Sequence, residues 1–262
     1  MRRRVAHRGA HLAMHLAALA VLVVLAALPV AAGPAARAET PAEGTPAEGT
    51  PAEEAPLPRP PDAANLAARA MTFTRVTGAP DACGPGCSEW IAAEGVILPG
   101  TVVTFSQLVE RLGPARPPVV IHSDGGMTDI AMALGRVIRR ARLDTVIART
   151  ARSDGTATIE PGGACHGACL FVLAAGVARS TAPGAVISIS PFDFHFATGG
   201  ALPEPRRQRL IVAMLERARG YFTDMGLDPD LASLLDSNTH TAFYPTRGQL
   251  EAYRILTRYQ DL

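Results

Sequence analysis

The chain of 262 residues contains no lysine, so all 25 of its basic residues are arginine. This absence excludes three kinds of site that need a lysine amine: a serine–lysine dyad, a lysine Schiff base and a phosphate-binding P-loop. Aromatic residues are also scarce, at 5% of the chain, whereas 48% of the residues are hydrophobic. That hydrophobic content is ample for one globular domain with a sizeable core.

The arginines are unevenly distributed along the chain. Residues 1–38 hold five of them and no acidic residue, while residues 39–262 hold 20 arginines against 24 acidic residues, a net charge of −4. A mildly acidic body provides no electrostatic basis for binding nucleic acid. We therefore expect no nucleic-acid partner.

The first 38 residues have the pattern of an export signal. Basic residues lead an uncharged apolar run from Leu12 to Ala32, and residues 36–38 read Ala-Arg-Ala, which fits a signal-peptidase site. The run, roughly 20 residues long, could also span a bilayer, so a retained membrane anchor is the alternative. In both cases the positive end stays inside. The body is therefore expected in the periplasm, either free or anchored to the inner membrane.

Residues 39–62 read ETPAEGTPAEGTPAEEAPLPRPPD and repeat the unit TPAEG. A segment made almost entirely of Pro, Ala, Glu, Gly and Thr cannot bury a core, so the composition predicts a disordered linker. The folded domain is then expected to occupy residues 63–262.

Within this domain, short apolar segments alternate with amphipathic ones. Strands are expected over 89–98, 119–121, 145–148 and 185–189, and helices over 104–112, 130–138 and 168–175. The segment 66–76 fits either a short helix or a first strand. This succession predicts an α/β domain with parallel strands and right-handed crossovers. The last third is expected to be helical, over 210–222, 229–235 and 248–256.

Several segments of this domain, taken in order, resemble one protein family. They read CGPGCSEWIAAEG (83–95), SDGG (123–126), LGRVIRRARLDT (134–145), ACHGACLFVLAAG (164–176) and PGA (183–185). The chain resembles the Clp-protease and crotonase superfamily, in particular a bacterial periplasmic or membrane-anchored branch of Clp-peptidase-like proteins. The resemblance implies a repeated ββα spiral with a helical C-terminal part, often assembled into homo-oligomers, and a serine-peptidase site in the active members.

The resemblance also implies where the parts of such a site would lie. The usual nucleophilic serine is matched by Gly167, and the usual histidine base is matched by Ser190. Gly167 has no side chain, and a serine hydroxyl is too weak a base at neutral pH. Loss of either group would reduce hydrolysis by about 10³-fold or more. Gly125 and Gly126 match an oxyanion hole, although a turn that serves folding alone is the alternative for them.

Two functions stay open at this point. The first is a catalytically degenerate relative, a pseudo-peptidase that binds an extended peptide or protein or acts as an assembly module. The second is an active serine or cysteine hydrolase whose groups have moved, with Cys165, His166, Ser190 and His195 as candidates. Crotonase-type acyl-CoA chemistry is disfavoured, because CoA is cytosolic and this body is expected outside the cytoplasm. No cofactor is expected.

An even number of cysteines in an exported protein favours disulfides. Cys83 and Cys87 flank a Gly-Pro-Gly turn, and we expect a bridge between them. Cys165 and Cys169 can pair only if Cys165 precedes the helix, because Cβ atoms one helical turn apart are about 5–6 Å apart, too far for a disulfide. A buried Cys169 thiol is the alternative. We expect no metal site, since the C-x-x-x-C spacing is looser than that of a zinc knuckle.

Overall fold

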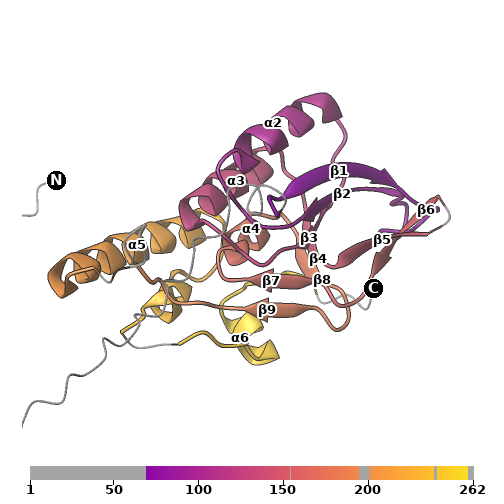
Figure 1. Ribbon diagram of the computed structural model, residues 1–262. Helices are drawn as coiled ribbons and strands as arrows, with labels where there is room; N and C mark the ends of the chain where they lie inside the picture. Colours follow the sequence, from indigo (N-terminus) through magenta and orange to yellow (C-terminus); the bar gives the residue numbers. More distant parts are fainter. Residues whose placement is uncertain (1–68, 154, 195–199, 201, 239–240, 259–262) are drawn as a thin grey trace, which may run out of the picture. The chain divides into compact units, whose positions relative to one another are not determined.

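Five strands form the central sheet, in the order β1-β2-β3-β4-β8 (Figure 1). The strands β2 (Glu89–Glu94), β3 (Val119–His122), β4 (Thr145–Ile147) and β8 (Arg179–Thr181) are parallel. The strand β1 (Thr72–Thr77) pairs antiparallel with β2 at one edge. The expected α/β class is confirmed, and β1 begins within the segment 66–76, which fitted either a helix or a strand.

This computed structural model describes residues 69–258 except 154, 195–199, 201 and 239–240. The expected signal or anchor (1–38) and the expected linker (39–62) lie outside the described residues, as does His195. Among the helices that are described, none is both long and apolar enough to cross a bilayer.

Alternate residues of each strand point to opposite faces of the sheet, and the two faces carry different cores. Ile91 and Ile121 face a large core shared with the helices, while Trp90 and Val120 face a smaller one. The large core lies under helices α2 (Thr101–Leu112), α3 (Thr128–Arg140) and α4 (Cys169–Ala174). The hairpin of β5 (Arg149–Ser153) and β6 (Thr156–Glu160) lies on the opposite side (Figure 1).

Among the described residues of the last third, three helices lie close to the positions that the pattern predicted. It contains α5 (Glu204–Asp224), the 3-10 helix η1 (Pro229–Leu235) and α6 (Arg247–Ala252). The apolar stripe of α5 packs into the large core through Met214, Ala218, Tyr221 and Phe222. The long helix therefore supplies one wall of the domain.

One strand of the central sheet was not predicted, and one predicted strand belongs to another sheet. The segment predicted over 185–189 contains β9 (Val186–Ser188), but β9 pairs in parallel with β7 (Ala164–His166) in a separate two-stranded sheet. The fifth strand of the central sheet is β8, whose Arg-Ser-Thr sequence has no apolar signal. Arg179 is nevertheless only 3% exposed. Its guanidinium donates to carbonyl oxygens of Gly176, Met225, Arg254 and Ile255.

Candidate functional site

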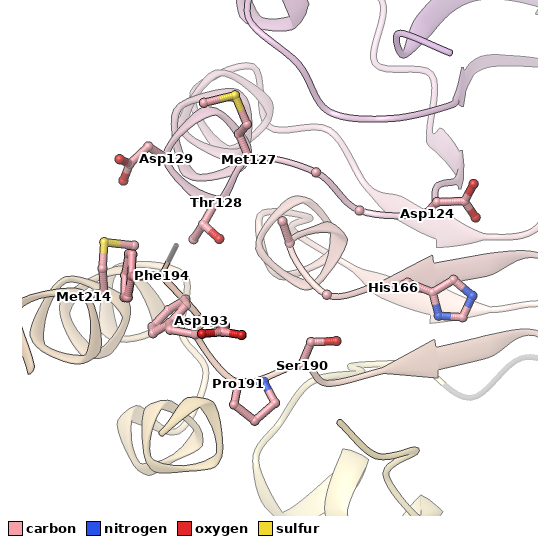
Figure 2. A pocket seen from close by; sticks show the side chains of 15 residues that line it. Asp124, Met127, Thr128, Asp129, His166, Ser190, Pro191, Asp193, Phe194 and Met214 are labelled. Atoms are coloured by element: carbon pink, nitrogen blue, oxygen red, sulfur yellow. The ribbon is translucent and has the colours of Figure 1, made fainter. Parts of the chain in front are cut away.

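A cavity of about 560 Å³ opens where the chain passes from β3 into α3 (Figure 2). Three segments line it, residues 124–129, 166–168 and 190–194, together with Met214 of α5. We call this cavity the glycine pocket. It contains all four of the positions that the family resemblance matched to an oxyanion hole, a nucleophile and a base: Gly125, Gly126, Gly167 and Ser190.

The two glycines after β3 are required by the packing of the backbone. Both have positive φ, +91° for Gly125 and +137° for Gly126. The backbone of Ile97 lies against them, since its N–H donates to the Gly125 carbonyl (2.7 Å) and its own carbonyl accepts from Met127 N–H (2.9 Å). A Cβ on Gly126 would collide with the Ile97 carbonyl oxygen. Folding alone therefore explains glycine at these two positions.

The amide groups around the pocket differ in what they are free to bind. Gly125 N–H already donates to Ser123 Oγ at 3.1 Å, and that hydroxyl donates to the Gly95 carbonyl at 2.6 Å. By contrast, the N–H groups of Gly126 and Ala168 donate to no acceptor among the residues described. A ligand carbonyl would therefore find its donors at Gly126 and Ala168 more readily than at Gly125.

Gly167 and Ser190 face each other across the pocket. Gly167 lies in the turn between β7 and α4, with φ of +51°. A Cβ built on it would lie 3.5 Å from Ser190 Oγ and 3.6 Å from Ser190 Cβ. Side chains at these two positions would thus be in contact, which is the relation that a nucleophile and its base require. Neither residue present can fill that role.

His166 makes a contact that the sequence did not reveal. Its Nδ1 lies 2.7 Å from Ser188 Oγ. The two residues are partners in the register of β7 and β9, so their side chains share a face. Ser188 was not singled out, because the strand β7 was not predicted and its partner was therefore unknown. Ser188 is 7% exposed, and in Figure 2 the imidazole of His166 and the hydroxyl of Ser190 point the same way.

The rest of the lining is apolar apart from three carboxylates. Met127, Phe192, Phe194 and Met214 supply the apolar part, and the carboxylates are those of Asp124, Asp129 and Asp193. Arg217 pairs with Asp129 at 2.8 Å. The Asp124 carboxylate would repel a developing oxyanion if it pointed into the pocket. In Figure 2 its carboxylate points away from Met127, and Arg69 approaches it to 3.3 Å. The pairing and the direction both weaken that repulsion.

Both cysteine pairs form disulfides. Cys83–Cys87 spans 5.0 Å between Cα atoms, and Cys165–Cys169 spans 5.2 Å. Cys165 lies in β7, before the helix that begins at Cys169, so the condition for pairing is met. Because its sulfur is bonded, Cys165 has no thiolate with which to attack, and it is not a nucleophile in this structure. No cluster suited to a metal ion occurs among the described residues.

No protein-family model and no curated protein sequence matches the chain. Similar solved structures include a variant of the 1510-N membrane-bound stomatin-specific protease (13% identity, TM-score 0.46, covering 63% of this chain and 75% of that chain). Another variant of it, in complex with a substrate peptide, has 14% identity and a TM-score of 0.45, covering 63% and 70%. ClpP1 from Listeria monocytogenes has 15% identity and a TM-score of 0.44, covering 64% and 88%. Because the identities are below 25% and the TM-scores below 0.5, no conclusion about this chain is drawn from these likenesses.

Proposed function

We propose that this protein is exported and that its ClpP-like domain binds an extended peptide in the glycine pocket without cleaving it. One observation carries the proposal. A side chain at position 167 would touch that of Ser190, yet the chain has glycine at 167 and a weakly basic hydroxyl at 190. The arrangement for nucleophilic attack is therefore retained while the reacting groups are absent.

The remaining features of the pocket suit a peptide. Its volume of about 560 Å³ lies within the range of roughly 300–1,000 Å³ that is usual for ligand sites. Gly126 and Ala168 can donate N–H groups to a peptide carbonyl, and Met127 and Met214 offer an adaptable apolar surface to one side chain. Few polar donors beside a largely apolar lining are typical of a site that orients its ligand.

Export and self-association belong to the same proposal. Two disulfides in a short domain favour an oxidising compartment such as the periplasm, in agreement with the basic and apolar N-terminal segment. The family resemblance implies a homo-oligomer, in which the domain would act as an assembly module. Exposed apolar side chains on α2 and α5, Val103 (61%) and Val212 (50%), are candidates for that contact.

A hydrolase that uses Ser188 is the second candidate, because a hydroxyl and an imidazole nitrogen lie 2.7 Å apart at His166. Such a pair is the minimal unit of an activated serine. Ser188 is almost fully buried, however, so a substrate would need the β9 region to open before its carbonyl could reach the hydroxyl.

Fluorophosphonate labelling of the full chain separates the two functions. We expect no labelling and no peptide cleavage by the natural sequence, and we expect labelling of the double variant Gly167→Ser/Ser190→His. Serine at a φ of +51° costs about 1–2 kcal/mol, which the fold should tolerate. Labelling of the natural chain that Ser188→Ala abolishes, but Ser190→Ala does not, would establish the hydrolase instead.

Peptide binding itself is tested by fluorescence anisotropy with a library of labelled extended peptides. Met127→Asp should weaken binding at least ten-fold, because it places a charge in the apolar part of the pocket. Val177→Asp, at an exposed apolar residue outside the pocket lining, is the matched control. Equal affinities for the two variants would contradict binding in the glycine pocket.

A further inference from the structure

The strand β9 has one edge that the fold leaves partly unpaired. On the edge toward β7, Val186 N–H donates to the Gly163 carbonyl at 2.8 Å, and the Ser188 carbonyl accepts from Gly167 N–H at 3.1 Å. Successive residues of a strand direct their backbone groups to opposite edges, so those of Ile187 point away from β7. Neither its N–H nor its carbonyl has a hydrogen-bond partner among the residues that the structure describes.

A proline explains why this edge is open. Two residues further along the same edge, Ile189 exchanges two hydrogen bonds with Phe243, at 2.9 and 3.0 Å, in an antiparallel bridge. Antiparallel partners advance in opposite directions along the chain, so the next pair would be Ile187 with Pro245. Proline has no N–H and cannot donate to the Ile187 carbonyl. The pairing therefore stops after one bridge and leaves a donor and an acceptor for a strand from elsewhere.

A cavity of about 460 Å³ opens at this point, between β9 and the segment that leads into α6 (Figure 1). We call it the edge pocket. Residues 185–187 line one side of it, and Tyr244, Pro245 and Leu250 line the other. Every lining residue is uncharged, and none of them lines the glycine pocket. Val186 (39%) and Tyr244 (70%) are large apolar side chains with unusual exposure, so the surface beside Ile187 is both apolar and accessible.

These features specify the chemistry of a ligand. A strand opposite Ile187 would donate one hydrogen bond and accept one, as Phe243 does for Ile189, so the ligand must present an extended polypeptide backbone. The uncharged lining favours uncharged side chains, because a charge placed there would lose hydration without gaining a partner. The volume lies in the range of roughly 300–1,000 Å³ that is usual for ligand sites.

A strand from a second copy of the chain does not fit the edge pocket. The ligand lies between β9 and residues 244–250, so a strand that brings its own neighbour would collide with that segment. Each strand that the structure describes is already paired along at least one edge. We propose that the edge pocket binds an extended, uncharged segment of a partner protein, such as a tail, which adds to β9 as a strand. This site is independent of the function proposed for the glycine pocket.

Photo-crosslinking of the full chain tests the proposal. The variant carries p-benzoylphenylalanine in place of Tyr244, an exposed residue whose replacement keeps an aromatic ring. The probe is a short biotinylated peptide of alternating valine and threonine. Irradiation should join this peptide to the chain about ten-fold more efficiently than when the same photoreactive residue replaces Val177, an exposed apolar residue outside both pockets. Equal yields from the two positions would overturn the proposal.

A matched depsipeptide separates strand pairing from simple apolar adsorption. It keeps the same side chains, but esters replace its central amides, so it lacks the N–H donors that would reach the Ile187 carbonyl. Its yield at position 244 should be about ten-fold lower than that of the peptide, because the main-chain hydrogen bonds supply the affinity of an added strand. Equal yields from peptide and depsipeptide would show that no strand is added at this edge.

The same crosslinks distinguish other occupants and the other pocket. A product that joins position 244 to the same chain or to a second copy, and that excess peptide does not suppress, would mean that the edge pocket is already filled, and the proposal would be wrong. Met127→Asp, which changes only the glycine pocket, should leave the peptide yield at position 244 unchanged. A parallel loss would place the peptide in the glycine pocket. Absence of peptide binding in the glycine pocket would leave the edge site standing.

Discussion

At the scale of single residues, two glycines within helices, Gly135 and Gly220, differ in how closely their neighbours pack. On α3, a Cβ on Gly135 would collide with the hydroxyl of Tyr221 and lie 2.9 Å from the carbonyl oxygen of Phe171. That hydroxyl donates to the same carbonyl at 2.6 Å, and burial raises the pKa of Tyr221, which keeps it a neutral donor. Gly220 on α5 has no such neighbour, because a Cβ there would meet nothing within 4 Å.

The substitutions Gly135→Ala and Gly220→Ala should therefore change stability in opposite directions. Gly135→Ala displaces a buried hydrogen bond, at a cost of about 1–3 kcal/mol plus strain, which outweighs the helix-propensity gain of about 1 kcal/mol. Gly220→Ala has the gain in helix propensity without a steric cost, so it should raise the free energy of unfolding by about 0.5–1 kcal/mol. Urea unfolding followed by circular dichroism measures both. A Gly135→Ala variant as stable as the natural chain would mean that Tyr221 moves aside without loss.

At the scale of elements, the two disulfides close loops of equal length but lie in different surroundings. Each closes a loop between cysteines four positions apart, which in the chain-entropy model contributes about 2 kcal/mol. Cys83–Cys87 closes a partly exposed turn before β2, whereas Cys165 and Cys169 are fully buried at the junction of β7 and α4. The second bridge encloses the turn that carries His166 and Gly167.

Burial should decide the order in which the two bridges are reduced. When the folded protein is treated with a mild reductant and iodoacetamide, we expect Cys83 and Cys87 to be alkylated at least ten-fold faster than Cys165 and Cys169. The reason is access, since exchange requires a thiolate to reach the sulfur. Timed mass spectrometry of the alkylated peptides measures the rates. Equal rates would show that the β7–α4 junction opens without global unfolding.

The strand β8 contains a buried arginine, Arg179. Among the described residues, no carboxylate pairs with it. Arg179 donates instead to carbonyl oxygens at the ends of α4, α5 and α6. Burial lowers its pKa to about 10, with the charges of Arg139 and Arg254 adding to the effect. The guanidinium is thus still protonated at neutral pH and keeps all its donors.

Replacement of Arg179 should destabilise the packing of the C-terminal helices against the central sheet. Arg179→Met leaves several carbonyl oxygens without a donor and should lower the free energy of unfolding by about 3 kcal/mol or more. The matched control is Arg136→Met on α3, whose guanidinium lies over the Tyr221 ring at 5.3 Å and should contribute less than about 1 kcal/mol. Guanidinium chloride unfolding compares the two variants. A similarly small loss of stability in both would show that Arg179 does not stabilise the contact between the sheet and the helices.

At the scale of the whole molecule, the absence of lysine makes the export proposal easy to test. An amine-reactive reagent can modify only the α-amino group of this chain, because no side-chain amine competes. If the signal is cleaved after Ala38, the single labelled residue of the exported protein should be Glu39. Ala38→Arg should block that cleavage and give a longer product. Labelling at the original N-terminus of the natural chain would indicate a retained anchor.

Much of this molecule could be predicted from local pattern. The apolar strands β3 and β4, the amphipathic helix α3 and the Cys83–Cys87 bridge follow from periodicity and spacing over a few residues. The Cys165–Cys169 bridge was left open, because it depends on where α4 begins. Gly167 and Ser190 were singled out by the family resemblance and not by local pattern, and the structure brings them into one pocket.

Only the tertiary structure decided how these parts meet. The partnership of β7 with β9, the contact of His166 with Ser188 and the burial of Arg179 each join residues 22 to 76 positions apart. The hydrogen bond from Gly125 N–H to the Ser123 hydroxyl joins residues only two positions apart. It still depends on tertiary packing, because Gly95 and Ile97 bond to the same turn. Local propensity reports which backbone shapes a segment prefers. Hydrogen bonds between distant segments depend on which groups the completed core leaves within reach of one another.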